Sequence, residues 1–255
     1  MLTLPASLKI KRDKASEAHL YQVCRTWLEK EERAPGVHAS SLLDPRQAYW
    51  QQVDPKPLSD RLVTIFIIGK ILHAFVLSAL VGAKGVDWST DTGSKTSKKL
   101  GIVYSMDYIH EGKPTEFKTS RSFYMPTHVE DLALYAEQLL VYEVAEDQTI
   151  GRLWILYLNA KNKKKQTEPA FRCYNVTLSK ADKEAFGKQI IETRTKLEVA
   201  LKKKNPKELP LCRPFKCGPD GCEWWDQCKP QGRYGLPKKE WSQQCASFYA
   251  TKRRL

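Results

Sequence analysis

The strongest constraint on the fold of this chain is the stretch that begins at Leu100 and reads LGIVYSMDYIHEGKPTEFKTSRSF. Two short runs, residues 101–109 and 115–120, are separated by His-Glu-Gly-Lys-Pro, whose glycine and proline supply turn chemistry. This arrangement predicts a β-hairpin. Because side chains alternate between the two faces of a strand, Glu116 and Lys118 are expected on the same face.

Two carboxylates and a lysine come together on this hairpin. Asp107 is expected on the first strand, and Glu116 and Lys118 on the second. Magnesium and manganese prefer hard oxygen ligands and keep several waters, which an Asp, a Glu and a main-chain carbonyl would supply. The pattern therefore predicts a divalent-cation site. The alternative is that these are ordinary solvent-side strand residues, since most charged residues are exposed.

Two further elements flank the hairpin in the sequence. Upstream, the apolar helical segment FIIGKILH ends at His73, and downstream the segment QLLVY places Gln138 and Tyr142 four residues apart, on one helix face. The order of these elements around Asp107 and Glu-Phe-Lys resembles the PD-(D/E)xK nuclease superfamily. Within it, the chain is most similar to the RecB-like branch that includes the CRISPR-associated Cas-four exonucleases and their phage and mobile-element relatives. The likeness extends over residues 38–228.

The resemblance implies a restriction-endonuclease-like fold and a Mg²⁺- or Mn²⁺-dependent deoxyribonuclease, an exonuclease in preference to an endonuclease. The implied metal ligands are His73, Asp107, Glu116 and the carbonyl of Phe117. The implied catalytic residues are Asp107, Glu116, Lys118, Gln138 and Tyr142. Lys118 would orient or polarise the attacking water. A lone histidine in an apolar helix is also typical of a packed core residue, and this alternative stays open for His73.

The implied partner is DNA, with single strands favoured, and CRISPR integrase proteins are a further candidate. The implied role is DNA processing in CRISPR adaptation or in phage and mobile-element recombination and repair. A formal net charge of +13 and a pI near 9.3 independently favour a polyanionic partner. Phosphate contacts are expected from Arg121, the basic loop 161–165 and Lys202 to Lys204. The rival hypothesis is a non-catalytic, metal-cluster-stabilised DNA-binding or adaptor protein.

Four cysteines near the C-terminus form a second candidate site. Cys212, Cys217, Cys222 and Cys228 lie within CRPFKCGPDGCEWWDQC. Zinc ribbons prefer paired two-residue gaps, which this segment does not have, so an iron–sulfur cluster is at least as good an interpretation as zinc. The resemblance favours a 4Fe–4S cluster. Cys173 and Cys245 are interpreted as structural.

The chain departs from the resemblance at one cluster ligand. Relatives usually supply one thiolate from an N-terminal Cys-Pro-Arg, whereas this chain has Asp44-Pro-Arg. Three alternatives follow: Cys212 is the fourth thiolate, Asp44 itself ligates iron, or Cys24 takes this place. We favour Cys212, because four local thiolates need no long-range closure.

Compartment is inferred from cysteine usage and the absence of targeting signals. The N-terminal residues are basic and interrupted by Pro5, with no apolar run of secretory length. The apolar run over residues 62–82 is interrupted by Lys70 and His73, so a buried core helix is expected rather than a membrane span. Seven cysteines then indicate metal ligands in a reducing, cytoplasmic setting, and the sequence does not indicate an oligomeric state.

Hydrophobic periodicity predicts an α/β fold with a small mixed sheet flanked by helices. From Pro206 onward the sequence is rich in Cys, Pro, Gly and Trp and poor in periodicity, which predicts a Cys-rich C-terminal lobe held together by a metal cluster. The expected helices cover residues 15–32, a segment that starts after Ser40 or Ser41 and includes Tyr49, and residues 59–81, 128–145 and 180–204. Beyond the hairpin, strands are expected at 151–159 and 171–178. The expected divisions are an N-terminal helical segment (1–37), a nuclease core (38–205) and the Cys-rich lobe (206–255).

Overall fold

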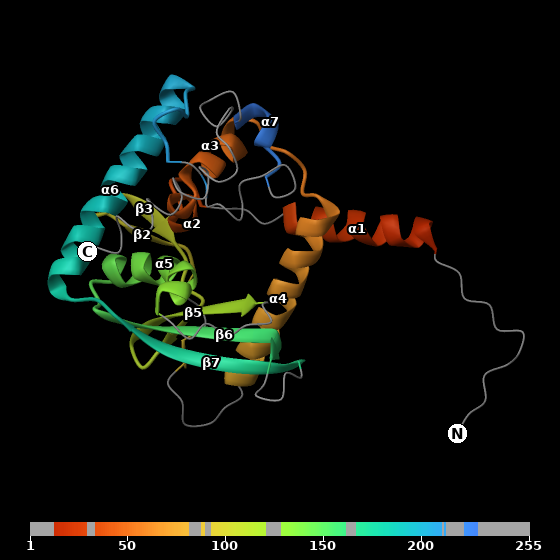
Figure 1. Ribbon diagram of the computed structural model, residues 1–255, viewed down its shortest axis with the longest axis horizontal. Helices are drawn as coiled ribbons and strands as arrows, with labels where there is room; N and C mark the ends of the chain where they lie inside the picture. Colours follow the sequence, from red (N-terminus) through yellow and green to blue (C-terminus); the bar gives the residue numbers. More distant parts are fainter. Residues whose placement is uncertain are drawn as a thin grey trace, which may run out of the picture. The chain divides into compact units, whose positions relative to one another are not determined.

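The computed structural model describes residues 13–29, 34–81, 88–89, 93–120, 129–161, 167–210, 212 and 222–228 (Figure 1). Its contacts divide the chain into two compact units. The first contains Met1–Arg33 and Pro57–Ala74, and the second contains Ala34–Lys56 and Phe75–Leu255. The three-part division expected from the sequence stays a prediction.

The first unit is built from α1 (Lys14–Glu29) and the part of α4 (Asp60–Val81) that precedes residue 75. The two helices are joined by the guanidinium group of Arg25 on α1. It donates to the carbonyl of Leu58 at 2.8 Å and pairs with the carboxylate of Asp60 at 2.6 Å. This anchor fixes α1 to the start of α4.

Helix α4 is apolar and ends at Val81, as expected, but it is not a buried core helix. Val63 is buried, whereas Phe66 is 44% exposed and Ile71 is 62% exposed. Two packed helices cannot enclose every face of such a segment, which explains the difference. Within the described ranges, no helix combines the length and the apolarity that a membrane span requires.

The second unit is organised on a five-stranded sheet with the order β1-β4-β5-β6-β7. Strands β5 and β6 are parallel, and the other neighbours are antiparallel. A separate antiparallel pair joins β2 and β3. The strands are β1 (Trp88–Ser89), β2 (Lys95–Ser97), β3 (Ile102–Tyr104), β4 (Tyr108–His110), β5 (Lys113–Ser120), β6 (Ile150–Lys161) and β7 (Thr167–Thr177). The predicted mixed α/β architecture, with a small sheet flanked by helices, is confirmed.

The predicted hairpin is formed by β4 and β5, with a tighter turn than expected. His110 pairs with Lys113, which leaves Glu111 and Gly112 as a two-residue turn. Their φ angles of 50° and 71° are both left-handed, as a type I′ hairpin turn requires. Pro114 therefore lies in β5, one residue before that strand begins to pair with β6. Its missing N–H thus falls outside the part of β5 that has neighbours on both sides.

Helix α5 (Val129–Ala145) is the crossover that parallel strands β5 and β6 require, and it lies on one face of the sheet (Figure 1). Helix α6 (Lys180–Lys203) packs against α5. Gly151 at the start of β6 permits a close approach, because a Cβ there would lie 2.8 Å from Cδ1 of Leu139 on α5. The core between α5 and the sheet includes the buried side chains of Leu139, Tyr142, Leu153, Ile155 and Tyr157.

Two short helices, α2 (Ala39–Leu43) and α3 (Pro45–Val53), lie where one helix was expected to begin after Ser40 or Ser41. They are separated by Asp44, whose φ of −137° and ψ of 69° are not helical. A residue that precedes proline is disfavoured in the helical region, so Pro45 explains the break.

Candidate active site

Asp107 lies at the bend that precedes β4, rather than on the first strand, where the sequence placed it. Its Oδ2 atom accepts a hydrogen bond from the main-chain amide of Phe117 at 2.8 Å. Tyr108 pairs with Thr115 in the hairpin, and this register brings the preceding Asp107 beside Glu116. The two predicted acids are therefore neighbours, although Asp107 lies at a bend and Glu116 on β5.

Glu116 is an almost fully buried acid, with 1% of its surface exposed. Its pKa is raised to about 8, first by burial and then by the negative charge of Asp107, while Lys118 acts in the opposite direction. Its Oε2 atom is buried and has no hydrogen-bond partner among the described residues. A buried carboxylate beside a second acid is costly unless a proton or a cation compensates the charge. Glu116 is therefore suited to bind either a proton or a cation.

Lys118 lies two residues beyond Glu116 on the same face of β5, as the alternation predicted. Its ammonium group forms an ion pair with Oε1 of Glu116 and donates to Oε1 of Gln138 at 2.9 Å. About a third of the Lys118 side chain is exposed. The ammonium group is therefore held between two acceptors while it stays accessible to solvent.

Gln138 and Tyr142 lie on one face of α5 and point toward β5. The Nε2 atom of Gln138 donates to the hydroxyl of Tyr142, so the amide oxygen faces Lys118. The pKa of Tyr142 is raised well above its usual value, chiefly by burial and then by the charges of Glu116 and Asp107. Tyr142 also lies close to Glu116, so that Glu116, Lys118, Gln138 and Tyr142 form a ring of four side chains.

One pair next to this ring was not predicted from the sequence. The hydroxyl groups of Ser120 on β5 and Tyr135 on α5 lie 3.0 Å apart and share a hydrogen bond. Ser120 follows Lys118 by two residues, and Tyr135 precedes Gln138 by three. Strand alternation and helix periodicity together could have indicated this pair, because they place both residues on the faces that carry the site.

The structure brings together five of the predicted site residues: Asp107, Glu116, Lys118, Gln138 and Tyr142. Phe117 joins them through its main-chain amide. His73 is partly buried on α4 and belongs to the first unit. Its assignment as a metal ligand stays a prediction.

A divalent cation fits the acids of this site. Among the described residues, no group of three or more His, Cys, Asp or Glu side chains is arranged to hold a metal. Magnesium, however, is often held through one or two carboxylates with waters and substrate phosphates completing its shell. The unpartnered Oε2 of Glu116 and the adjacent carboxylate of Asp107 match that donor set. Asp107, Glu116 and the carbonyl of Phe117 are the residues that would hold the ion.

The predicted cysteine cluster is not confirmed. Cys212 and Cys228 are buried, Cys222 is partly buried, and all three are free thiols. Cys217 and Cys245 lie outside the described residues. The pKa of the Cys222 thiol is raised, chiefly by burial, with nearby Cys228 acting in the same direction. The bound cluster and its ligand set stay predictions.

The stretch that contains Asp44 nevertheless lies beside a C-terminal cysteine. Arg46 is 2% exposed, and its guanidinium group donates to the carbonyls of Lys207 at 2.9 Å and Leu209 at 3.1 Å. It also contacts the sulfur of Cys228 at 4.0 Å. Cys212, Asp44 and Cys24 all stay open as the fourth cluster ligand. Sequence reasoning gave Arg46 no role, although its place after Pro45 at the start of α3 could have indicated one.

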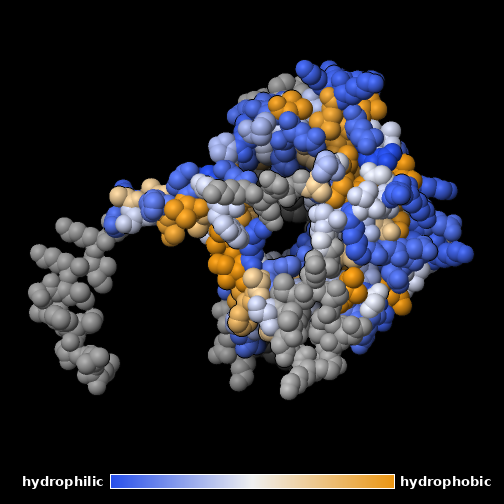
Figure 2. Space-filling view, turned by 180° about the vertical axis from the view of Figure 1, so that it is seen from behind, coloured by the Kyte–Doolittle hydropathy of each residue, from blue (hydrophilic) through white to orange (hydrophobic). Residues whose placement is uncertain are grey.

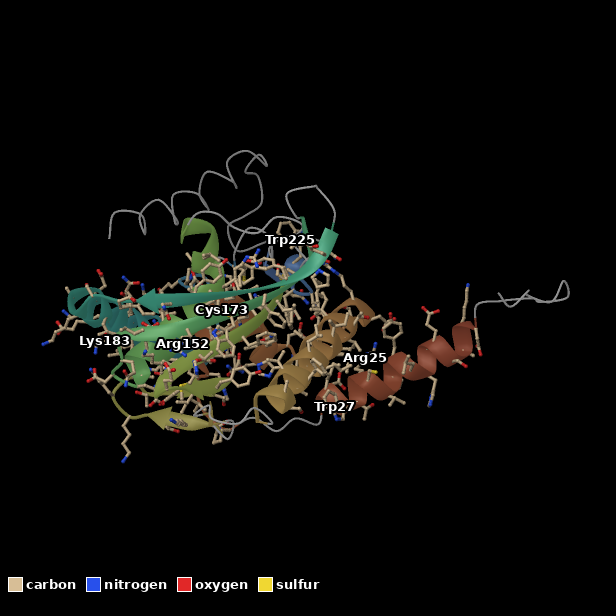
Figure 3. All side chains as sticks on the ribbon, turned by 90° about the horizontal axis from the view of Figure 1, so that it is seen from below. Arg25, Trp27, Arg152, Cys173, Lys183 and Trp225 are labelled. Carbon is tan, nitrogen blue, oxygen red and sulfur yellow. The ribbon has the colours of Figure 1, made fainter. Side chains whose placement is uncertain are left out.

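The other end of α3 contacts α7 (Trp225–Cys228), on which Trp225 is labelled in Figure 3. The indole Nε1 of Trp224 donates to the carbonyl of Asp54 at 2.7 Å, and Gln227 donates to the Asp54 carboxylate at 3.1 Å. Helix α3 is therefore the element on which the described part of the Cys-rich segment is packed.

The predicted basic surface includes three lysines at the end of α6, which the structure describes. Lys202, Lys203 and Lys204 are exposed at the end of this helix. Figure 2 shows that hydrophilic residues predominate on the side of the second unit that α6 occupies. Arg121 and the basic loop at residues 162–165 lie outside the described residues. Their expected phosphate contacts stay predictions.

The face of the sheet that is turned away from α5 carries an arginine that contacts the hairpin turn. Arg152 on β6 and Cys173 on β7 point away from α5 (Figure 3). Arg152 contacts the Nε2 atom of His110 at 3.1 Å and forms an ion pair with Glu111, which ties β6 to the hairpin turn. These contacts support the hairpin from the side that faces away from the site.

The fold and the site define a mixed α/β chain in which one hairpin presents two neighbouring acids and a lysine to a crossover helix. No protein-family model and no curated protein matches the sequence.

Solved structures that match this chain do so distantly. The crystal structure of SSO0001 matches with a TM-score of 0.47 and 18% identity, covering 72% of this chain and 86% of that one. The alkaline exonuclease LHK-Exo from Laribacter hongkongensis matches with a TM-score of 0.39 and 11% identity, covering 77% and 86%. Its complex with dAMP matches with a TM-score of 0.42 and 12% identity, covering 66% and 91%.

Proposed function

We propose that this protein is a metal-dependent deoxyribonuclease with a restriction-endonuclease-like core, which hydrolyses phosphodiester bonds with Mg²⁺ or Mn²⁺. The observation that supports this best is the buried Glu116, which lies next to the partly buried Asp107 and is paired with Lys118. Two acids and a lysine on one hairpin suit metal-assisted hydrolysis of a phosphodiester. The net charge of +13 supports a nucleic acid as substrate.

The residues of the site have distinct roles in this mechanism. A divalent cation held by Asp107, Glu116 and the carbonyl of Phe117 would lower the pKa of a bound water and would neutralise charge on the phosphate. Lys118 donates to the attacking water or to the phosphate from the position in which Gln138 holds its ammonium group. Tyr142 fixes the amide of Gln138, so that the amide oxygen faces Lys118. Burial of Glu116 strengthens each of these electrostatic interactions, because little water competes.

We extend the proposal to exonuclease action on single-stranded ends, with His73 as an additional metal ligand. The order of His73, Asp107, Glu116 and Gln138 along the chain supports this extension. The corresponding biological role is DNA processing in CRISPR adaptation or in mobile-element recombination and repair. Oligonucleotides blocked at the 5′ end, at the 3′ end or at both ends, as matched single and double strands, test this part. Cleavage of single strands blocked at both ends, at the unblocked rate, contradicts the exonuclease assignment.

The test of the activity itself is cleavage of an end-labelled oligonucleotide in Mg²⁺, in Mn²⁺ and in EDTA. We expect cleavage in both metals, with a loss of at least ~100-fold in Glu116→Gln, because a charged group acting in the transition state is removed. Glu143→Gln is a matched control: Glu143 is also buried and its pKa is also raised to about 8 by burial. Equal activity of wild type and Glu116→Gln contradicts the proposal. Tight DNA binding without cleavage by wild type supports the rival adaptor hypothesis.

We also propose a 4Fe–4S cluster bound by Cys212, Cys217, Cys222 and Cys228, which the spacing of these cysteines supports. Freshly purified protein should absorb broadly near ~400 nm through sulfur-to-iron charge transfer. Replacement of Cys228 by serine should abolish this absorbance. Colourless protein with stoichiometric zinc rules out the iron–sulfur interpretation.

A further inference from the structure

Helix α5 and strand β5 face each other through three pairs of polar side chains. The residues on α5 are spaced by three and four positions, and those on β5 by two, so each set lies on one face of its element. The pairs are Tyr142 with Glu116, Gln138 with Lys118, and Tyr135 with Ser120. The first two pairs belong to the site already described, whereas the third lies beyond it.

We propose that Tyr135 and Ser120 are positioning residues, which keep Gln138 within hydrogen-bonding distance of Lys118. The inference rests on the proposed nuclease function and adds two residues to it. Tyr135 lies about one helical turn from Gln138, and Ser120 lies two residues from Lys118. Their hydrogen bond of 3.0 Å therefore fixes the separation of α5 and β5 next to the Lys118 contact.

The position of Gln138 matters because Lys118 has a flexible four-carbon stem. In the structure, the ammonium group of Lys118 is held by Glu116 on one side and by Gln138 on the other. A cation bound to Glu116 weakens the attraction of that acid for Lys118. The amide oxygen of Gln138 then becomes the contact that determines where the ammonium group lies.

The Ser120 end of this hydrogen bond is shielded from water, because Ser120 is 7% exposed, whereas Tyr135 is half-buried. Removal of either hydroxyl group removes the constraint that the bond places on the separation of α5 and β5. We therefore expect α5 to shift relative to β5 next to the Lys118 contact. A misplacement of about 1 Å in a catalytic constellation costs up to ~100-fold in rate.

Kinetic variants test this proposal. We expect Tyr135→Phe and Ser120→Ala to lower the single-turnover cleavage rate by about 10-fold with unchanged affinity for DNA. Ser120→Thr, which keeps the hydroxyl group, should retain most of the rate. In a Gln138→Ala background, Tyr135→Phe should have no further effect, because the group through which it acts is absent. Tyr104→Phe is the matched control, since it removes a 2.8 Å hydrogen bond to Glu146 at the far end of α5.

A spectroscopic test separates this proposal from the nuclease function. The side-chain amide signals of Gln138 are identified in a ¹H–¹⁵N correlation spectrum as the pair that Gln138→Ala removes. We expect Tyr135→Phe and Ser120→Ala to shift this pair, and Tyr104→Phe to leave it in place. Unshifted signals overturn the positioning role whether or not the protein cleaves DNA. If Tyr135→Phe or Ser120→Ala weakens the affinity for DNA, and its effect adds to that of Gln138→Ala, the positioning role is overturned. Tyr135 and Ser120 then contact the phosphate directly. Shifted signals in a protein that does not cleave DNA contradict the proposed function alone.

Discussion

The carboxylate of Asp107 accepts a hydrogen bond from the main-chain amide of Phe117 at 2.8 Å, which attaches the first acid directly to the strand that carries the second. Phe117 lies between Glu116 and Lys118, so this single contact fixes Asp107 relative to both residues. The hydrogen bond has a structural effect, and the negative charge has a chemical one. Substitutions can separate the two.

Asp107→Asn keeps an oxygen that accepts from the Phe117 amide but removes the charge. We expect its unfolding free energy to stay within about 1 kcal/mol of wild type, with a loss of ~100-fold or more in cleavage. Asp107→Ala removes both functions and should unfold at a lower urea concentration than Asp107→Asn. Urea denaturation and single-turnover cleavage measure the two effects. Equal stability of the two variants shows that the hydrogen bond contributes little.

Cation binding should depend on pH through Glu116. The pKa of this acid is raised to about 8 in the metal-free protein, so below pH 8 a cation must displace a proton. Apparent affinity for Mn²⁺ should therefore rise by up to about 10-fold per pH unit toward pH 8 and level off above it. Calorimetry in buffers of different ionisation enthalpy measures the proton released. A pH-independent affinity, or an affinity unchanged in Glu116→Gln, contradicts the assignment of Glu116 as a ligand.

Glu143 should make the protein less stable as pH rises. Neither of its carboxylate oxygens has a hydrogen-bond partner among the described residues, and burial raises its pKa from its ordinary value of 4.5 to about 8. Between these values the folded state binds more protons than the unfolded state, so stability falls as pH rises through that window. Glu143→Gln should be more stable than wild type at pH 8.5, and the difference should vanish near pH 4. Thermal unfolding across this range is the measurement. A pH-independent difference shows that Glu143 does not change its protonation on folding.

Arg46 should determine whether the C-terminal cysteine segment stays packed on α3. Its guanidinium group donates to the carbonyls of Lys207 and Leu209 and contacts Cys228. Arg46→Leu leaves the buried carbonyl of Leu209 unpaired, at a cost of about 1–3 kcal/mol. We expect faster trypsin cleavage after Lys207, with the hairpin of β4 and β5 intact. Arg25→Leu is the matched control, because Arg25 also donates to a carbonyl but lies in the first unit. Unchanged proteolysis in Arg46→Leu contradicts the anchoring role.

The elements that carry the site could be predicted because their signals are local. Alternation placed Glu116 and Lys118 on one face, and a spacing of four placed Gln138 and Tyr142 on another. The helix cap at Ser179 was also predictable, since its hydroxyl accepts from the amide of Asp182 at 3.0 Å. In each case neighbouring residues in the sequence determine the geometry.

The features that were missed depend on long-range contacts. The displacement of Asp107 from the strand follows from its bond to Phe117, and the role of Arg46 follows from carbonyls more than 160 positions later. The exposure of α4 was missed because apolar content alone does not show how many faces of a helix will be covered. The hydroxyl pair of Tyr135 and Ser120 needed the packing of α5 on β5 to be recognised.

The parallel pairing of β5 with β6 also has a consequence for synthesis on the ribosome. The acids, the lysine and the amide of the site are all translated before β6, yet Glu116 gains its second strand neighbour only when Leu153 pairs with it. Until then this acid should remain hydrated, with an ordinary affinity for protons. We expect the nascent hairpin to form first and the site to acquire its raised pKa last, when the crossover helix delivers the strand that buries Glu116.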